Sequence, residues 1–198
     1  TMMPYMKVAA LNGKNIVSSD AMDVVENTDN TDGTTLTIKD SKLTSNENIA
    51  LWGGSIELTN TNLKTDKETN DKDNNIDIDA FKTFGDTTTA DSSNTVKVTG
   101  GSMESGGDIS VQGGSIALDG VKNMQSAKEK GISLVASNKL TVTDKQKDEI
   151  ALENTADNSI SVKNTTMTTD DAMAIIGGKV DVDGSNLTAG DLEMVAGS

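Results

Sequence analysis

The sequence predicts an all-β protein, a right-handed single-stranded parallel β-helix (solenoid) with about 20 residues per coil. Three observations predict this fold. An apolar–polar–apolar triplet recurs along the chain, each triplet is followed by a Gly, Asn or Asp at a fixed distance, and only 2% of the residues are aromatic. All 198 residues are expected to form one β-helix domain.

The apolar triplets recur at a nearly constant spacing. Alternation of apolar and polar residues is the period of a β-strand whose apolar side faces a core. Successive triplets start 20, 40, 20, 24, 20 and 20 residues apart. Their first residues are Leu36, Ile56, Val96, Ile116, Leu140, Ile160 and Val180. Ile16 lies one period further upstream and is interpreted as the start of a degraded first coil.

The residue four positions after the start of each triplet is always Gly, Asn or Asp. These residue types accept a left-handed backbone conformation or form Asx turns. The series that begins with Ile16 is Asp20, Asp40, Asn60, Gly100, Gly120, Asp144, Asn164 and Gly184. A tight turn is therefore expected after the first strand of every coil.

Two further short strands are expected in each coil. An apolar residue returns about seven positions after most triplet starts, for example Leu43 and Met103, and a third apolar pair follows, for example Ile109 and Val111. Three strands in 20 residues cannot form an independent sheet, but they can form one coil that pairs with its neighbours. Right-handedness follows from the rule for parallel crossovers. An immunoglobulin-like sandwich would not repeat its turn residues at a fixed period.

The 40-residue step from Ile56 to Val96 has two interpretations. It holds either two coils, the second starting at Ile76, or one coil with inserted loops. We prefer one coil, because Ile76 and Ile78 complete the core positions of the coil that starts at Ile56. The inserted loops are then residues 64–75 and 80–94, and insertions in solenoids often carry binding.

Side chains with oxygen atoms alternate along residues 71–79, which suggests a cation site. The side chains that would bind Ca²⁺ are Asp71, Asp73, Asp77 and Asp79. The segment lacks the Gly of an EF-hand loop and has Lys82 where that loop has Glu. The alternative, which we prefer, is a solvated strand in which Ile76 and Ile78 point inward and Asp77 and Asp79 point outward. No other cofactor is expected.

Three of the four aromatic residues, Trp52, Phe81 and Phe84, fall near the same inserted segment. On adjacent coils they would form a platform on which a sugar ring stacks. The alternative, which we prefer, is that they cover the base of the inserted loops.

Charge and composition argue against several classes of function. A formal net charge of −14 repels phosphate backbones, so nucleic acid is not expected as a partner. No run of apolar residues is long enough to span a membrane. Paired aspartates such as Asp181 and Asp183 occur, but Arg and His, the usual helpers of β-helix lyases, are lacking, so an enzyme is not expected.

The coils resemble those of filamentous haemagglutinin-type adhesins, the secreted partners of two-partner secretion systems. The matching phrases are Gly106-Gly107-Asp108-Ile109-Ser110-Val111, Gly114-Ser115-Ile116-Ala117-Leu118 and Asn186-Leu187-Thr188-Ala189-Gly190-Asp191-Leu192. The resemblance extends over residues 35–198, coil by coil. The secretion motif and the capping domain of that family are not found in this sequence. The chain is therefore expected to be a fragment of a longer fibre whose coil ends can associate end to end.

The resemblance implies a structural and adhesive segment of a secreted bacterial cell-surface adhesin. Such a stalk would present loops to a receptor or glycan on a host cell or a neighbouring cell. One alternative is a polysaccharide-binding or polysaccharide-degrading β-helix, as in lyases and phage tailspikes. Another is part of an autotransporter passenger domain.

Overall fold

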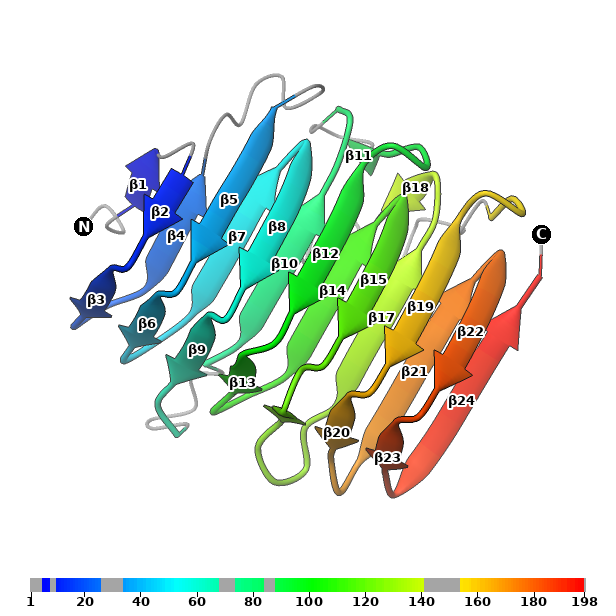
Figure 1. The fold of residues 1–198 in the computed structure, drawn as a ribbon. Helices are drawn as coiled ribbons and strands as arrows, with labels where there is room; N and C mark the ends of the chain where they lie inside the picture. The colour runs from blue at the N-terminus through cyan, green and yellow to red at the C-terminus, as the bar shows by residue number, and fades with distance from the viewer. Residues whose placement is uncertain are drawn as a thin grey trace.

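The computed structural model describes residues 5–7, 10–25, 34–67, 74–83, 88–140 and 154–197. These residues form strands and turns, and none of them lies in a helix. Three parallel sheets of eight, seven and seven strands form the walls of a solenoid (Figure 1). The predicted all-β solenoid fold is therefore confirmed.

Each coil contributes one strand to each sheet in turn. Sheet 1 contains β2 (Ala10–Asn12), β5 (Thr35–Lys39), β8 (Ser55–Thr59), β12 (Thr95–Thr99), β15 (Ser115–Asp119), β19 (Ser159–Lys163) and β22 (Lys179–Asp183). Sheet 2 contains β3 (Asn15–Ser18), β6 (Lys42–Ser45), β9 (Asn62–Thr65), β13 (Ser102–Glu104), β16 (Asn123–Gln125), β20 (Thr166–Thr168) and β23 (Asn186–Thr188). Sheet 3 contains β1 (Tyr5–Lys7), β4 (Met22–Val25), β7 (Ile49–Gly53), β10 (Ile76–Ala80), β14 (Ile109–Gly113), β17 (Ile132–Ala136), β21 (Ala172–Gly177) and β24 (Asp191–Ala196).

The solenoid is right-handed. In Figure 1 the strands of sheet 1 run downward in front, the strands of sheet 3 return behind them, and successive coils advance from left to right. Seven coils at the usual strand spacing of about 4.8 Å give a stack roughly 35 Å long. Strands that are neighbours in a sheet therefore come from coils that follow one another in the sequence.

The core consists of apolar side chains stacked in rows along this axis. Ile56, Val96, Ile116 and Ile160 are consecutive register partners in sheet 1, and all four are buried. Similar rows line the inner faces of sheets 2 and 3, where Met103 pairs with Met124. Burying each such side chain contributes about 1.5–3 kcal/mol. Because aliphatic side chains fill the narrow interior, the low aromatic content is explained.

The turn between sheets 1 and 2 is left-handed, as predicted. The backbone φ angle is positive at Asp40, Asn60, Gly100, Gly120, Asn164 and Gly184, with values from 47° to 68°. An Asn at this turn also restricts the residue at the same turn of the next coil. Gly100 follows Asn60 in the stack, and a Cβ atom at Gly100 would lie 2.5 Å from Oδ1 of Asn60. A coil that follows an Asn at this turn therefore needs Gly.

The start of the first coil differs from the prediction. Ile16 lies in β3 of sheet 2, where it pairs with Leu43, and it does not begin a sheet 1 strand. The residue equivalent to Asp40 is Gly13, with φ of 66°, and Asp20 is not among the residues with positive φ. The prediction was wrong because Leu11 pairs with Ile38, an offset of 27 residues, so the first period is longer than 20.

The triplet that starts at Leu140 does not begin a coil. β15 pairs directly with β19, so Ile116 is followed in the stack by Ile160. Leu140 lies instead in β18 (Lys139–Leu140), which pairs antiparallel with β11 (Thr88–Thr89) outside the three sheets. The sequence explains the difference, since Lys147 occupies the place where the second strand needs an apolar residue. Asp144 and the pair Ile150 and Leu152 lie outside the described residues.

The chain between Ile56 and Val96 contributes one strand to each sheet. Ile56 pairs with Val96 in sheet 1, and Ile76 pairs with both Ile49 and Ile109 in sheet 3. Of the loop 64–75, residues 64–65 belong to β9 and residues 68–73 lie outside the described part. Of the loop 80–94, Ala80 ends β10 and residues 88–89 form β11. No helix in the described part of the chain has the length and apolar character needed to cross a membrane.

Candidate functional site

The aromatic residues predicted as a sugar platform form a small core of their own. Trp52 extends from β7 and Phe81 follows β10, and their rings meet edge to face with centroids 6.5 Å apart and planes at 69°. Phe81 is fully buried, so it has no ring face open to a sugar. Phe84 lies outside the described residues. This geometry agrees with the interpretation that aromatic residues cover the base of the inserted loops.

Two segments leave the stack, one after β10 and one after β17, and we call them the excursions. They meet at the small core just described, which we call the second core. Phe81, Ala90 and Leu140 form it, and Trp52 packs against them. The β11–β18 pair and a backbone hydrogen bond from Ala90 to Asn138, 2.9 Å long, join the segment after β10 to the segment after β17. Leu140 therefore fixes one excursion against the other.

The aspartates predicted to bind Ca²⁺ are only partly described. Asp71 and Asp73 lie outside the described residues. Asp77 and Asp79 are on the outer face of β10, and Asp79 is only 2% exposed because it lies beside Trp52, its register partner on β7. Among the residues that the structure describes, no group of three or more acidic side chains gathers at one place. The calcium site stays a prediction.

Burial changes the acidity of Asp79. Desolvation and the neighbouring charge of Asp77 raise the pKa of Asp79 well above its ordinary value, and the adjacent polar N–H of the Trp52 indole lowers the pKa in part. A carboxyl group in such surroundings favours its neutral form. This burial cannot be predicted from the sequence, because Asp79 occupies an outward position of an ordinary alternating strand.

A polar groove follows the corner between sheets 2 and 3. It consists of two hollows of about 570 and 600 Å³ that share Gln125, Ser126 and Lys128. The remaining residues that line it are Lys64, Thr65, Lys67, Glu104, Ser105, Gly106, Ala127, Thr168, Thr169, Asp170, Thr188, Ala189 and Gly190. We call this feature the corner groove. It crosses five coils, from β9 to β23.

Buried hydroxyl groups fix the floor of the corner groove. The Thr65 hydroxyl donates to the carbonyl oxygen of Asn74 at 2.6 Å and accepts the Gly106 N–H at 2.8 Å. Ser105 donates in the same way to the Asp108 carbonyl oxygen at 2.7 Å. Ser126 and Thr169 continue the row, and both hydroxyls donate to the carbonyl oxygen of Lys130. The floor is rigid because each of these side chains is bonded across a turn.

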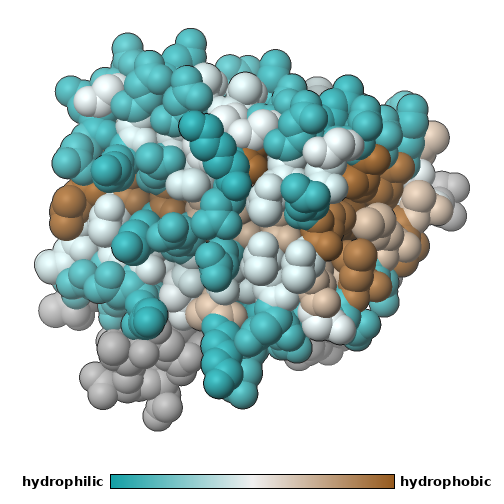
Figure 2. All heavy atoms as spheres, turned by 60° about the horizontal axis from the view of Figure 1, so that its bottom comes forward, coloured by the Kyte–Doolittle hydropathy of each residue, from teal (hydrophilic) through white to brown (hydrophobic). Residues whose placement is uncertain are grey.

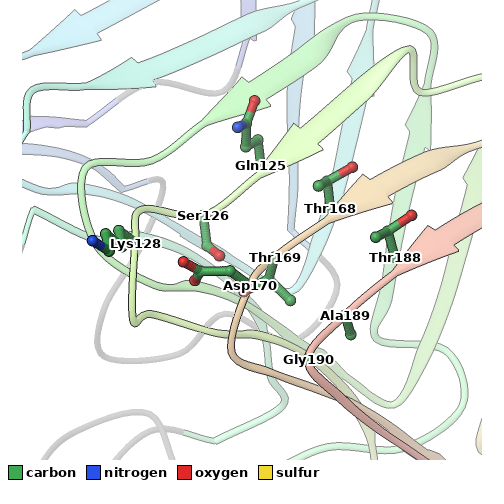
Figure 3. Close-up of a pocket in the computed structure, with 9 residues that line it drawn as sticks. All are labelled: Gln125, Ser126, Lys128, Thr168, Thr169, Asp170, Thr188, Ala189 and Gly190. Carbon is green, nitrogen blue, oxygen red and sulfur yellow. The ribbon is translucent and has the colours of Figure 1, made fainter.

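Polar side chains project from the strand ends above this floor. Gln125, Thr168 and Thr188 occupy equivalent positions on β16, β20 and β23, and Figure 3 shows their polar ends on the same side of the ribbon. They are spaced by one coil, about 4.8 Å. This row can offer hydrogen bonds to a ligand that extends along the axis of the solenoid.

Charged side chains border the corner groove. Lys64 and Glu104 approach to 3.9 Å, and both are exposed, so the pair contributes little to stability. Lys128 lies in a turn that separates the two hollows, closed by a hydrogen bond from Lys130 N–H to Ala127 oxygen at 3.1 Å. Oδ1 of Asp170 accepts the N–H of Glu129 from this turn at 2.9 Å. Asp170 therefore holds Lys128 at the groove.

Sequence reasoning missed the corner groove, although one signal for it exists. A Ser or Thr stands two residues after the inward-facing residue of β6, β9, β13, β16 and β20, at Ser45, Thr65, Ser105, Ser126 and Thr169. Such a period of buried hydroxyls marks a corner held by side-chain hydrogen bonds.

Comparison with known proteins adds no relative. No protein-family model matches the chain, and no match was found among curated proteins or solved structures. The solenoid fold and the two features described above are therefore the basis for a functional proposal.

Proposed function

We propose that this chain is a rigid structural and adhesive segment of a secreted bacterial cell-surface adhesin of the haemagglutinin type. The observation that supports the proposal most is the continuity of the stack. Sheets 1 and 2 each continue through seven strands, and their core rows stay in register although two excursions leave the stack on the way. A solenoid of this kind keeps its shape because every coil is bonded to its neighbours along the axis.

The excursions supply what such a stalk would present. The second core of Phe81, Ala90 and Leu140 attaches the described parts of both excursions to the stack beside Trp52 of sheet 3. Loops on a rigid scaffold are common positions for binding residues. In this mechanism the coils provide the spacing from the cell, and the residues of the excursions contact the receptor or glycan on the opposing cell.

A cell-binding assay tests this proposal. The chain is coupled to fluorescent beads, and adhesion to host cells and to bacterial cells is counted. We expect saturable adhesion that the free chain inhibits, and loss of adhesion when residues 84–87 and 141–153 are replaced by Gly-Ser linkers. The matched control replaces Lys97 and Thr99 by Ser, because both residues are exposed on β12 of sheet 1 and lie outside the excursions. Adhesion no greater than that of a globular protein of similar charge would contradict the proposal.

The corner groove favours a second candidate, a polysaccharide-binding β-helix. Its row of Gln125, Thr168 and Thr188 offers hydrogen bonds at the spacing of the coils, and a preformed polar surface suits the hydroxyl groups of a sugar chain. Binding to a glycan array tests this candidate. A Thr168→Val, Thr188→Val double variant is expected to weaken binding about tenfold or more, in line with two lost hydrogen bonds. Thr99→Val, on the exposed face of β12, is the control and should bind normally.

A further inference from the structure

The larger hollow of the corner groove, about 600 Å³ in volume, is lined by more cations than anions. The charged residues that line it, among those the structure describes, are Lys64, Lys67, Lys128 and Glu104. The whole chain has 31 acidic and 17 basic residues, so this local excess of positive charge is opposite in sign to the net charge. Hollows of this size commonly bind ligands, and a cationic hollow in an acidic surface favours an anionic one.

The charges in this hollow alternate along the axis of the solenoid. Lys64 and Lys67 belong to the coil of β9, and Lys128 follows β16, two coils further on. The coil between them contributes Glu104, which is the register partner of Lys64 on one side and of Gln125 on the other. Because coils are about 4.8 Å apart, the two cationic positions are separated by about 10 Å along the axis, with a carboxylate between them.

The lysines can turn to a ligand at little cost. Lys64 and Glu104 lie 3.9 Å apart with side chains that are 60% and 51% exposed, so their ion pair contributes little to stability. Lys128 is exposed, and the turn that bears it is fixed by the hydrogen bond between Asp170 and Glu129. Glu129 itself does not line the hollow. The charge of Lys128 is therefore held in place and open to a ligand.

The floor of the hollow is uncharged and tightly packed. Ser105 and Ser126 are buried, and their hydroxyls donate to carbonyl oxygens of the fold. Gly106 packs so closely on the coil of β9 that a Cβ atom there would lie 1.5 Å from the carbonyl oxygen of Asp66. Figure 2, in which the lower corner of Figure 1 is turned forward, shows mainly hydrophilic residues on this side. A ligand would therefore lie along the floor and bind through side chains at the rim.

We propose that the larger hollow binds a linear acidic polysaccharide in which a sugar with a carboxylate alternates with an uncharged sugar. The polysaccharide would lie along the solenoid axis with about one sugar per coil of about 4.8 Å. Two carboxylates would then meet Lys64 and Lys128, while the uncharged sugar between them passes Glu104. A carboxylate on every sugar would place one beside Glu104, and like charges repel. The inference rests on the second candidate function, the polysaccharide-binding groove, and names its class of glycan.

Screening by salt decides which charges such a glycan meets. At an ionic strength of about 0.15 M the Debye length is about 8 Å, so a glycan in the hollow feels the lysines that it contacts more than the distant acidic residues. At about 0.01 M the Debye length is about 30 Å, and the net charge of −14 repels the same glycan. Binding is therefore expected to be stronger at about 0.15 M than at about 0.01 M, and to weaken again towards 1 M as the contacts themselves are screened.

Isothermal titration calorimetry with hyaluronan oligosaccharides tests the proposal, because their uronic acids alternate with uncharged sugars. The matched ligand is the same oligosaccharide with its carboxylates reduced to alcohols, which should bind about tenfold more weakly, in line with two lost exposed ion pairs. Lys64→Gln and Lys128→Gln should each weaken the binding of hyaluronan about threefold and leave the binding of the reduced form unchanged. Lys97→Gln is the control, because it makes the same charge change at an exposed position of β12, outside the groove.

Polygalacturonate, which has a carboxylate on every sugar, tests the alternation. Glu104→Gln should strengthen the binding of polygalacturonate more than that of hyaluronan, because it removes the repulsion at the middle coil. An equal effect on both glycans would overturn the proposal. Equal affinities for hyaluronan and its reduced form, or lysine variants that bind as the wild type does, would overturn it as well but would leave the polysaccharide-binding groove standing. Failure of both forms and of every glycan on the array to bind would overturn the second candidate function together with this inference.

Discussion

The carboxyl group of Asp79 on β10 lies beside the indole of Trp52, its register partner on β7, at the outer face of sheet 3. Burial and the negative charge of Asp77 raise the pKa of Asp79, and the neighbouring indole of Trp52 does not cancel their effect. The folded chain therefore binds this proton more tightly than the unfolded chain does. Stability is linked to pH wherever the two states differ in this way.

Asp79→Asn is expected to stabilise the protein at neutral pH. The stability that the neutral carboxyl group contributes is fully present below the ordinary pKa of Asp, about 4, and is lost as the pH rises through the raised pKa of the folded state. The variant removes the ionisable group but keeps the shape and a hydrogen-bond acceptor. Urea unfolding between pH 3 and pH 8 measures the difference between the two chains.

The expected change of this stability difference with pH has a definite sign. The stability of Asp79→Asn minus that of the wild type should be near zero at pH 3 and should grow as the pH rises. A difference that is largest at pH 3 would contradict the raised pKa of Asp79.

The main core and the second core are expected to unfold separately. Leu140→Ala removes a fully buried side chain from the second core, and large-to-small changes of this kind cost about 2–5 kcal/mol. The protein contains one Trp, and Trp52 packs against this core, so its fluorescence is sensitive to the packing of the second core. In Leu140→Ala we expect a lower urea midpoint by fluorescence and an unchanged midpoint by far-UV circular dichroism. Val162→Ala, in the main core, should lower the midpoint measured by circular dichroism. If fluorescence and circular dichroism instead gave the same midpoint shift in each variant, the two cores would unfold as one cooperative unit.

The sequence predicts the coils well because their determinants are local. The alternation of a strand places Leu36 and Ile38 on the same side of the strand. The residue four positions after the first residue of the triplet, such as Asp40, permits the left-handed turn. Both signals fit within six residues and recur, so they reinforce one another. The triplet at Leu140 shows the limit, since Leu140 starts the same alternation but lies in β18, outside the three sheets.

The second core and the corner groove depend on distant contacts. Phe81 meets Leu140, and Gln125 lies above Thr168, across separations that the insertions between coils make irregular. Periodicity cannot predict which insertion folds onto which face, because the lengths of the excursions are unrelated to the coil period. The burial of Asp79 follows from the same contacts and is therefore equally hidden in the sequence.

Glycines at the corner before sheet 1 are expected to be intolerant of any side chain. A Cβ atom at Gly114 would lie 1.5 Å from the carbonyl oxygen of Asp91, a backbone atom that can move only if the coils separate. Gly114→Ala should therefore destabilise the chain by about 3 kcal/mol or more, the upper range for overpacking. Gly120→Ala is the control. Its new Cβ would meet nothing within 4 Å, so only the left-handed backbone, with φ of 68°, opposes it, at about 1–2 kcal/mol. Urea unfolding that ranks the two variants in the opposite order would contradict this account of the corner.

Asn158 joins three segments at the same corner and is expected to be irreplaceable by Asp. Its buried amide donates to the carbonyl oxygen of Gly114 at 2.8 Å and to Oδ1 of Asn138 at 3.0 Å, and its oxygen accepts the N–H of Thr155 at 2.7 Å. Asn158→Asp replaces the donor by an acceptor that faces two oxygen atoms, and it buries a charge. Leaving such groups unsatisfied costs about 1–3 kcal/mol, and more for a charged group.

The cost of Asn158→Asp should fall at low pH, because a protonated carboxyl group can donate one of the two lost hydrogen bonds. Asn94→Asp should behave in the same way, since Asn94 donates to the Gly54 carbonyl oxygen at 2.8 Å from the equivalent corner two coils earlier. The control is Asn164→Asp at the exposed left-handed turn, where Asp40 already shows that Asp is accepted. The free energy of unfolding in urea, measured at pH 4 and pH 7, distinguishes the buried positions 94 and 158 from the exposed position 164. A loss of stability at Asn164 as large as that at Asn158 would show that the chain rejects the added charge as such, and that the buried hydrogen bonds of the corner are not the cause.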